Sequence, residues 1–458
     1  MKRNLSSFIV FAVFMLMLSA TAKAEIFTAY LSSAQEVPTN ASTATGYARI
    51  VVNESTGALT FTVVFTGLSS TQTASHIHAP AVIGANVGVA INFGAVGGTS
   101  GTVSGATTIT PTQLAQLRAH QGYVNVHSTN FGGGEIRGQL GVQRPVDDDG
   151  DGRTDFSLLR FPNVAPPGVA PITYWNANST SGVQNALWGD ANRDFPAPGD
   201  YDGDGKTDLA LYRSGATVGA QSEFWILRSS DNNIQYFAWG LNGDQAVARD
   251  YDGDGITDVA IFRPGAAAGI TAGWYIRNSA TGTVRVEAFG TTGDGTNNFD
   301  TPVPGDYDGD GKFDLAVYRF ALTPANNFIV KRSSDGVVIY QQWGNFNSDY
   351  VLPGDYDGDG KTDYAIARTG SLSTSPLVWW ILQSSNGQVR VQTFGRTSDL
   401  PAQGDYDGDA RTDIAVYRNG ASASANSFFF VYRSFDNTVQ TVTWGLGGDF
   451  PVNNFDVR

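Results

Sequence analysis

The chain has 458 residues, a formal net charge of −14 and no cysteine. This length allows two or more domains, and the lack of cysteine excludes both a disulfide scaffold and a cysteine nucleophile. Nucleic-acid binding requires clustered Lys and Arg to neutralise phosphates, which an acidic chain without such clusters does not offer. We therefore expect no nucleic-acid partner.

Residues 1–24 have the three parts of a secretory signal. Lys2 and Arg3 form a basic start, residues 8–18 are apolar, and residues 22–24 read Ala-Lys-Ala. The apolar run is shorter than the ~20 residues that a membrane span requires, and the small-x-small pattern is typical of a cleavage site. We predict cleavage before Glu25, export, and no transmembrane segment afterwards. Secreted, periplasmic and cell-surface locations remain open.

Residues 25–144 are expected to form a β-sandwich-like domain. Short β-rich runs at 47–52, 59–65, 87–93 and 123–126 are separated by turn-forming residues. One short helix is predicted in this part of the chain. Thr110 can cap its start and Pro111 suits its first position.

All four histidines of the chain lie in this N-terminal part. His76 and His78 are two residues apart, which places both rings on one face of a strand. His127 falls on the polar face of its own run. These three imidazoles are a candidate zinc or copper site. In the alternative interpretation they are strand-end histidines that bond to the backbone or to Glu135.

Four separated segments of residues 25–141 resemble a bacterial CHRD (chordin-type) domain. They read AEIFTAYLSSAQEVP, SHIHAP, PTQLAQLRAHQGYVNVHS and GGGEIRGQL. The resemblance implies an extracellular β-rich domain with no known reaction. The metal interpretation of the histidines comes from their spacing and not from this family.

The rest of the chain carries six acidic loops. DYDGDGKTD at 200–208 is the clearest copy, with aspartates at its first, third, fifth and ninth positions. Alternate carboxylates on a glycine-rich turn are suited to Ca²⁺, which takes several oxygen ligands. The predicted ligands are Asp147, Asp149, Asp151 and Asp155; Asp200, Asp202, Asp204 and Asp208; Asp250, Asp252, Asp254 and Asp258; Asp306, Asp308, Asp310 and Asp314; Asp355, Asp357, Asp359 and Asp363; Asp405, Asp407, Asp409 and Asp413.

These loops recur about every fifty residues, and each opens a repeat with the same order of parts. A strand of the LALYR type follows the loop, then an aromatic strand, then a strand that ends in an aromatic-Gly step. Such a unit predicts one β-propeller blade, so residues 145–458 should form a propeller of six blades. The tail at 450–458 copies the segment that leads into each loop, and we expect it to close the ring on the first blade.

The repeats resemble FG-GAP/VCBS propeller repeats, which also occur in the heads of integrin α-chains. The motif DxDGDGxxD, followed by a LAVYR-like strand, carries this resemblance over residues 147–454. It implies that the seventh position adds a backbone carbonyl ligand, as at Lys206. Two loops depart from the pattern. The first has Asp148 where the others have Tyr, and the sixth has Ala410 where the others have Gly, which costs ~1 kcal/mol if positive φ is needed.

We predict a non-catalytic binding or adhesion protein with structural Ca²⁺ and an extracellular protein or glycan as partner. Insertions at 266–269, 293–298 and 421–426 are candidate recognition loops. The propeller has no histidine, and its Glu223 and Glu287 look isolated, so no catalytic set is predicted there. The alternative is a zinc- or copper-dependent enzyme that uses the N-terminal histidines.

Overall fold

The computed structural model describes residues 24–453 apart from several short segments. These segments are 54–55, 82–84, 119–120, 141–145, 150–152, 163–169, 179–181, 204–205, 253–255, 280, 293–299, 310–311, 321–326, 345–348, 359–360, 408–410 and 435–436. The predicted signal up to residue 23, the candidate recognition loop at 293–298, Ala410 and the fourth histidine, His120, therefore lie outside the described residues.

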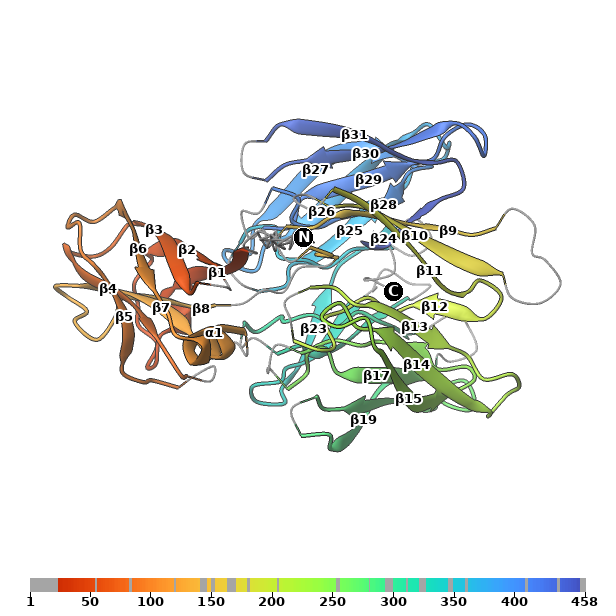
Figure 1. Cartoon of the computed structure of the whole chain (residues 1–458), viewed down its shortest axis with the longest axis horizontal. Coiled ribbons are helices and arrows are strands. Elements are labelled where there is room, and N and C mark those ends of the chain that lie inside the picture. The colour runs from red at the N-terminus through yellow and green to blue at the C-terminus, as the bar shows by residue number, and fades with distance from the viewer. Residues whose placement is uncertain are drawn as a thin grey trace, which may run out of the picture.

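The described chain is nearly all β-structure, which confirms the predicted fold class. An eight-stranded antiparallel sheet comes first, and six four-stranded antiparallel sheets follow it. Figure 1 shows the first sheet to one side, in red and orange, and the six later sheets grouped together on the other.

The N-terminal sheet has the strand order β5-β4-β7-β8-β1-β2-β3-β6. Its strands are β1 (Ala24–Ser32), β2 (Thr45–Asn53), β3 (Ala58–Thr66), β4 (Gln72–His78), β5 (Val89–Gly94), β6 (Gly101–Thr108), β7 (Tyr123–Ser128) and β8 (Ile136–Gln139), with a 3-10 turn at Ser33–Gln35.

This sheet folds over one apolar core. Side chains of β3 alternate between exposed and buried, which is the period-2 pattern of a strand with one face in the core. Phe61 of β3 stacks on Phe93 of β5 with ring centroids 3.8 Å apart, although the two strands are distant in the strand order. The curled sheet thus packs two layers against each other, as the sandwich prediction requires.

The one helix of the described residues is α1 (Pro111–Arg118). The Gln113 N–H donates to Thr110 Oγ1 at 3.2 Å, and the Thr110 N–H donates back to Gln113 Oε1 at 2.9 Å. This reciprocal pair is a capping box, which satisfies amides that the first turn leaves unpaired. The predicted helix start is confirmed.

The six later sheets, numbered 1 to 6 in chain order, share one design. Sheet 1 contains β11 (Gly182–Asp190), β10 (Pro171–Asn178), β9 (Phe156–Arg160) and β32 (Phe450–Pro451); sheet 2, β12 (Asp194–Pro196), β13 (Leu209–Arg213), β14 (Gln221–Leu227) and β15 (Ile234–Leu241); sheet 3, β16 (Gln245–Ala246), β17 (Val259–Arg263), β18 (Thr271–Arg277) and β19 (Val284–Thr291); sheet 4, β20 (Asp300–Pro302), β21 (Leu315–Arg319), β22 (Asn327–Lys331) and β23 (Val338–Gln342); sheet 5, β24 (Asp349–Val351), β25 (Tyr364–Arg368), β26 (Pro376–Leu382) and β27 (Val389–Arg396); sheet 6, β28 (Leu400–Pro401), β29 (Ile414–Arg418), β30 (Asn426–Tyr432) and β31 (Val439–Leu446).

One edge strand of each sheet is the short segment that leads into the acidic loop. In sheet 2, Phe195 of β12 pairs with Tyr212 of β13. Sheet 1 receives this strand from the far end of the chain, because Phe450 pairs with Leu159 of β9. The predicted pairing of the tail with the first repeat is confirmed. The blue last sheet lies beside the yellow first sheet in Figure 1.

An ion pair between a buried aspartate and a partly exposed arginine joins this short edge strand to its neighbour in each of the six sheets. Arg418, at the end of β29, donates Nε and Nη2 to the two carboxylate oxygens of Asp399 at 2.8 and 2.7 Å. The equivalent pair in sheet 1 joins Arg160 to Asp449, so it also spans the two ends of the ring of sheets. The remaining pairs are Arg213–Asp194, Arg263–Asp244, Arg319–Asp300 and Arg368–Asp349.

Backbone hydrogen bonds link each acidic loop to the next and finally return to the first. The eighth residue of a loop donates its N–H to the carbonyl of the first aspartate in the preceding loop. Thr207 donates to Asp147 at 2.7 Å, and Thr154 of the first loop donates to Asp405 of the sixth at 2.7 Å. The other links are Thr257 to Asp200, Phe313 to Asp250, Thr362 to Asp306 and Thr412 to Asp355. The six loops thus form a closed cycle.

Removal of one arginine tests these ion pairs. Asp399 is fully buried and Arg418 is 28% exposed at its side chain. Arg418→Gln leaves the carboxylate buried without its partner, so we expect the free energy of unfolding in urea to fall by about 3 kcal/mol. Arg396→Gln, which removes an exposed arginine of β27, is the matched control. Equal stability of the two variants would contradict this role.

Candidate functional site

The acidic loops bring their carboxylates together. In the loops that start at Asp147, Asp200, Asp250 and Asp306, one carboxylate oxygen from each of the first, third and ninth positions lies within 4.8 Å of the others. The fifth-position aspartates, which the sequence also predicts as ligands, lie outside the described residues. They are Asp151, Asp204, Asp254, Asp310, Asp359 and Asp409.

The ninth-position aspartate organises its own loop. Asp208 is 1% exposed. Its Oδ2 accepts the Tyr201 N–H at 2.8 Å and its Oδ1 accepts the Ser229 N–H at 2.7 Å. One carboxylate therefore ties the start of the loop to the turn between β14 and β15. The same pair of bonds recurs at Asp258, Asp314, Asp363 and Asp413.

The tyrosine at the second position of a loop ties the loop to the segment that precedes it. The Tyr201 hydroxyl donates to the Ala197 carbonyl at 2.8 Å, in the segment just before the loop. Equivalent bonds are made by Tyr251, Tyr307, Tyr356 and Tyr406. In the first loop Asp148 replaces this tyrosine and accepts a hydrogen bond from the Ser157 hydroxyl. Burial, together with the neighbouring Asp149, raises the pKa of Asp148 to about 7.

The third-position aspartate leaves an oxygen for a cation. In the fifth loop, Oδ2 of Asp357 accepts the Ser385 hydroxyl at 2.7 Å. Its Oδ1 is buried and accepts no hydrogen bond from any described residue. A buried carboxylate oxygen without a donor is costly, and a hard cation is the natural partner for it. The residues present therefore fit Ca²⁺. The backbone carbonyl of Lys206 stays a prediction.

The clustered carboxylates also bind protons too tightly in the absence of a cation. Burial and then the Asp202 charge raise the pKa of Asp208 to about 7. Burial, Asp407 and Asp405 raise the pKa of Asp413 to about 8. A divalent cation would offset this mutual repulsion and keep the carboxylates ionised.

Calcium and protons should therefore compete for the loops. A folded pKa above the unfolded value of about 4 means that the cation-free protein loses stability as pH rises from about 4 to 8. In EDTA we expect a lower melting temperature at pH 8 than at pH 5.5. Added Ca²⁺ should raise the melting temperature more at pH 8 than at pH 5.5, as measured by differential scanning fluorimetry. An equal calcium effect at both pH values would refute this competition.

The three N-terminal histidines also converge. His76 and His78 lie on β4 and His127 lies on the neighbouring β7, and one ring nitrogen from each lies within 4.8 Å of the others. His76 Nδ1 is 3.1 Å from His127 Nε2. The sequence predicts this grouping through the two-residue spacing of His76 and His78, but the strand pairing that adds His127 is a tertiary feature.

Backbone carbonyls fix the tautomers of two of these rings. His78 Nδ1 is 2.9 Å from the Val87 carbonyl, and His127 Nδ1 is 3.0 Å from the Gly132 carbonyl. A carbonyl only accepts, so both Nδ1 atoms carry the proton and both Nε2 atoms carry a lone pair. His78 Nε2 is buried and has no hydrogen-bond partner among the described residues. Glu135, the alternative partner from the sequence, accepts from Ser42 and Ser69 instead.

The surroundings keep these imidazoles neutral. Burial, His127 and His78 lower the pKa of His76 to about 4. Burial is also the main cause that lowers the pKa values of His78 and His127. The His78 ring stacks on Tyr123 with centroids 4.7 Å apart, and the Arg137 guanidinium lies 3.5 Å from the centre of the same Tyr123 ring. Three neutral imidazoles, two of them held by backbone carbonyls, fit Zn²⁺ or Cu²⁺.

The two glutamates that look isolated in sequence have partners. Glu223 accepts from Trp225 Nε1 at 2.8 Å and from the Tyr236 hydroxyl at 3.1 Å. Glu287 accepts from Lys331 Nζ at 2.7 Å. Both glutamates are therefore partly exposed strand residues with hydrogen-bond partners, on β14 and β15 for Glu223 and on β22 of the neighbouring sheet for Glu287. Sequence reasoning also missed the Arg–Asp pair of every sheet, although Arg closes each LAVYR-type strand and Asp recurs in each lead-in segment.

Comparison with known families agrees with both sequence resemblances. Residues 27–140 match the sequence model of the CHRD domain. Residues 250–317 and 355–416 match that of the FG-GAP-like repeat. The chain therefore contains a CHRD domain followed by FG-GAP-like repeats. Both families are in general non-enzymatic and suggest a binding or adhesion protein.

No curated protein matches the chain. Among solved structures, the crystal structure of AofleA from Arthrobotrys oligospora aligns with a TM-score of 0.43 and 10% sequence identity, covering 65% of this chain and 88% of that one. Among the described residues, no helix has the length and apolar character of a membrane span.

Proposed function

We propose that the chain is an exported, calcium-binding, non-catalytic binding or adhesion protein whose six sheets form a six-bladed propeller. The six four-stranded sheets, the closed cycle of loop hydrogen bonds and the strand supplied by the tail support this architecture. Cleavage after Ala24 would remove the basic start and the apolar run, which supports export.

Calcium has a structural role in this proposal. The ninth-position carboxylates are buried inside the protein and hold the loops to the neighbouring turns. A cation at each loop would stabilise the folded ring by linkage. Extracellular calcium sites of this type bind at roughly 10⁻⁴–10⁻³ M, which suits the calcium level outside cells. The loops then brace the protein in place of disulfides.

The observation that carries the binding function is an apolar row on the outermost strand of the sheets. On β15, Ile234 and Tyr236 are 56% and 46% exposed, and on β19, Val284 and Val286 are 55% and 58% exposed. Similar pairs lie on β23 (Val338, Tyr340) and β27 (Val389, Val391). These strands are also unpaired sheet edges. Exposed apolar rows on open edges are surfaces on which a partner docks.

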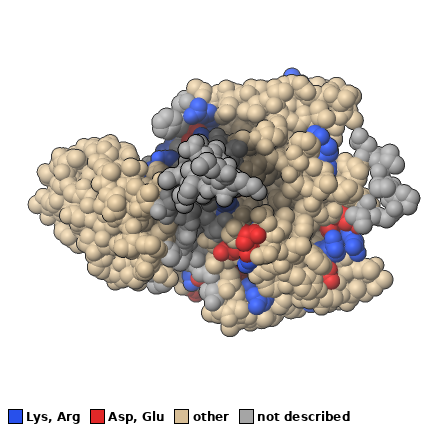
Figure 2. All heavy atoms as spheres, in the orientation of Figure 1, with Lys and Arg blue, Asp and Glu red and all other residues tan. Residues whose placement is uncertain are grey.

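The distribution of charged side chains agrees with docking on these apolar rows. Figure 2 shows acidic and basic side chains interspersed over the six sheets, and few charged atoms on the visible face of the N-terminal sheet. A surface of this kind has no broad basic patch on the face shown, and it is unsuited to phosphate backbones. An extracellular protein or glycan is the proposed partner.

Loss of one loop carboxylate tests the calcium role. Asp208→Ala should remove the stabilisation from one calcium site, about 1.4 kcal/mol when calcium is tenfold above its dissociation constant. Calcium titrations of the melting temperature, followed for wild type and variant, measure the difference. Asp231→Asn, which removes an exposed turn carboxylate outside the loops, is the control. If neither EDTA nor Ca²⁺ changes the melting temperature of the wild type, the calcium proposal is wrong.

The binding role is tested by a glycan and protein array probed in Ca²⁺ and in EDTA. We expect signals that depend on Ca²⁺ and weaken when exposed apolar residues of the outer strands become charged, as in Val284→Lys with Val286→Lys. Substitution at the exposed Leu372, in a loop away from these rows, is the control. Signals that survive the lysine variant unchanged would place the partner elsewhere.

A second candidate function rests on the histidine cluster. A single lone pair on each of three converging neutral rings is the ligand set of a zinc or copper site. A bound metal would supply Lewis-acid or redox chemistry. The chain itself contributes ring orientation through Val87 and Gly132 and partial access through the half-buried His76.

Copper retention tests this site independently of any activity. Because the pKa of His76 is lowered to about 4, protons compete weakly, and Cu²⁺ should remain bound at pH 5.5, where ordinary histidines are protonated. Electron paramagnetic resonance of the copper-loaded chain should show nitrogen ligands, and His78→Ala should remove them. Asp208→Ala should leave the spectrum unchanged. A metal-free chain after copper dialysis would refute the site.

A further inference from the structure

Where the six sheets meet, the structure contains a cavity of ≈ 500 Å³. Most of its wall comes from the segments that lead into the loops of sheets 2 to 6, namely residues 195–198, 244–249, 303–305, 353–354 and 403. Proline, valine and alanine dominate these segments, so the wall is largely apolar. Its volume is in the range of small-molecule sites, roughly 300–1,000 Å³.

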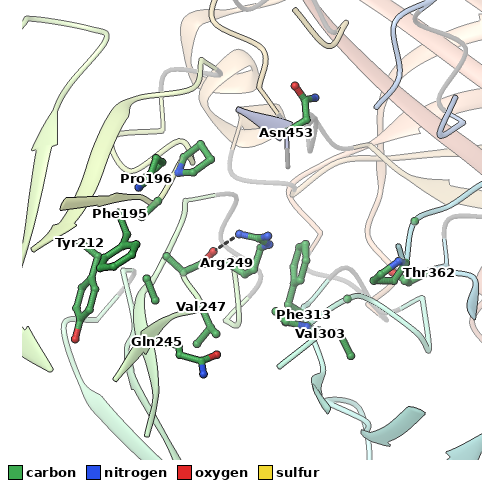
Figure 3. Close-up of a pocket in the computed structure, with 18 of the residues that line it drawn as sticks. Phe195, Pro196, Tyr212, Gln245, Val247, Arg249, Val303, Phe313, Thr362 and Asn453 are labelled. Carbon is green, nitrogen blue, oxygen red and sulfur yellow. Dashed lines mark hydrogen bonds between the residues drawn. The ribbon is translucent and has the colours of Figure 1, made fainter. Parts of the chain in front are cut away.

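One residue breaks the repeat inside this cavity. The position just before the first loop aspartate is Gly199, Gly305, Gly354 and Gly404 in four repeats, Val146 in the first and Arg249 in the third, and of the two departures Arg249 is the one that lines the cavity. Figure 3 shows Arg249 among the residues that line the cavity, with Phe313 beside it. Among the described residues no lysine lines the cavity, and its Asp244 is already bound by Arg263.

A second departure accompanies the first. A Cβ added to Gly199 would lie 2.6 Å from Oγ1 of Thr257, the eighth residue of the next loop. Glycine therefore leaves room for the threonine in these repeats, and the same contact recurs at Gly305 with Thr362, Gly354 with Thr412 and Gly404 with Thr154. The first repeat has Val146 at this position and keeps its threonine, Thr207. At Arg249 the facing residue is Phe313 instead of threonine. The Gly–Thr pair has been exchanged as a unit for Arg–Phe.

This exchange removes a stabilising bond. Where threonine is present its hydroxyl can accept the N–H of the first loop aspartate, as Thr207 does from Asp147 at 2.9 Å and Thr154 from Asp405 at 2.9 Å. Phe313 has no such acceptor. A local departure that loses a hydrogen bond and orders a long side chain is typical of a functional position.

The new pair offers a placed cation. The Arg249 guanidinium lies 5.8 Å from the centre of the Phe313 ring, within the range of a cation–π contact, and its Nη1 donates to the Ala248 carbonyl at 2.6 Å. The ring and the carbonyl hold the guanidinium against the wall. Arginine presents a planar fork of N–H donors that matches a carboxylate.

Two amides in the same wall also point to a ligand. Gln403 and Asn453 are 4% and 1% exposed. Both side-chain polar atoms of Gln403, and Oδ1 of Asn453, lack a hydrogen-bond partner among the described residues. Buried amide groups without partners are expensive. A polar group of a bound molecule would satisfy them.

We propose that this cavity binds a small monocarboxylic acid with a flat apolar body. The carboxylate pairs with Arg249, the apolar body lies against the proline and valine wall, and a polar substituent bonds to Gln403 or Asn453. A single cationic side chain matches one negative charge, which favours a carboxylate over a phosphate. This site goes beyond the proposed function, because a small molecule in the cavity is separate from a macromolecule on the outer strands.

Isothermal titration of the full chain in Ca²⁺ tests the proposal, with indole-3-acetate and 1-naphthoate as probes. Indole-3-acetamide, which keeps the shape and lacks the charge, should bind about tenfold or more weakly. The variant Arg249→Gly with Phe313→Thr restores the pair that other repeats carry. It should keep or raise the melting temperature and weaken both acids about tenfold or more.

Arg396→Gln removes an exposed arginine outside the cavity and should bind the acids as the wild type does. Equal affinity for acid and amide, unchanged affinity in the double variant, or no binding of either acid up to millimolar concentration would each overturn the inference. A chain that binds its macromolecular partner but neither acid refutes this inference alone. If the chain binds the acids but shows no calcium effect on its melting temperature and no signal on the arrays, the proposed function alone is refuted.

Discussion

The whole ring depends on placing one carboxylate per repeat where water does not reach it. Asp413 is 0% exposed, and its two oxygens hold the loop start at Tyr406 and the turn at Ser434. Backbone amides stabilise that charge, but burial and then the other aspartates of the loop oppose it, and the pKa of Asp413 rises to about 8. Each loop is therefore well ordered by hydrogen bonds and electrostatically incomplete. The calcium that we propose for these loops would offset this repulsion.

Two further kinds of interaction connect the six repeats to one another. The bidentate Arg–Asp pair joins the short edge strand of each sheet to the strand beside it. The backbone hydrogen bond from one acidic loop to the next joins neighbouring sheets. Both series close through the end of the chain, at Arg160–Asp449 and at Thr154–Asp405. A closed cycle has no terminal repeat to fray, which is why such a ring needs no disulfides despite its many short strands.

The chain separates two kinds of ligand chemistry. Oxygen ligands suit a hard cation and occur in the repeats, where any bound ion serves the fold. Neutral imidazoles suit zinc or copper, and they occur together in the N-terminal sheet, where His78 Nε2 is buried without a partner. In our proposals, binding by the ring uses two kinds of feature. The exposed rows of the outer strands recur from sheet to sheet, whereas the Arg249–Phe313 pair departs from the repeat.

The sequence by itself determined the periodic features, because each one is a local pattern that occurs in six repeats. Loop chemistry, the LALYR-type strands and the tail that copies a lead-in all follow from spacing and side-chain alternation. The start of α1 followed from its capping residues in the same way. Single, unrepeated features such as β8, or the partners of Glu223 and Glu287, carried no such signal.

Only the tertiary structure decided what depends on contacts between distant segments. It paired β4 with β7 and so brought His127 to His76. It set Arg213 against Asp194, and it placed Arg249 opposite Phe313 in a shared cavity. The physical reason is the same in each case. Strand register and ring closure bring together residues that lie up to 289 positions apart, and no local pattern encodes which of them will meet.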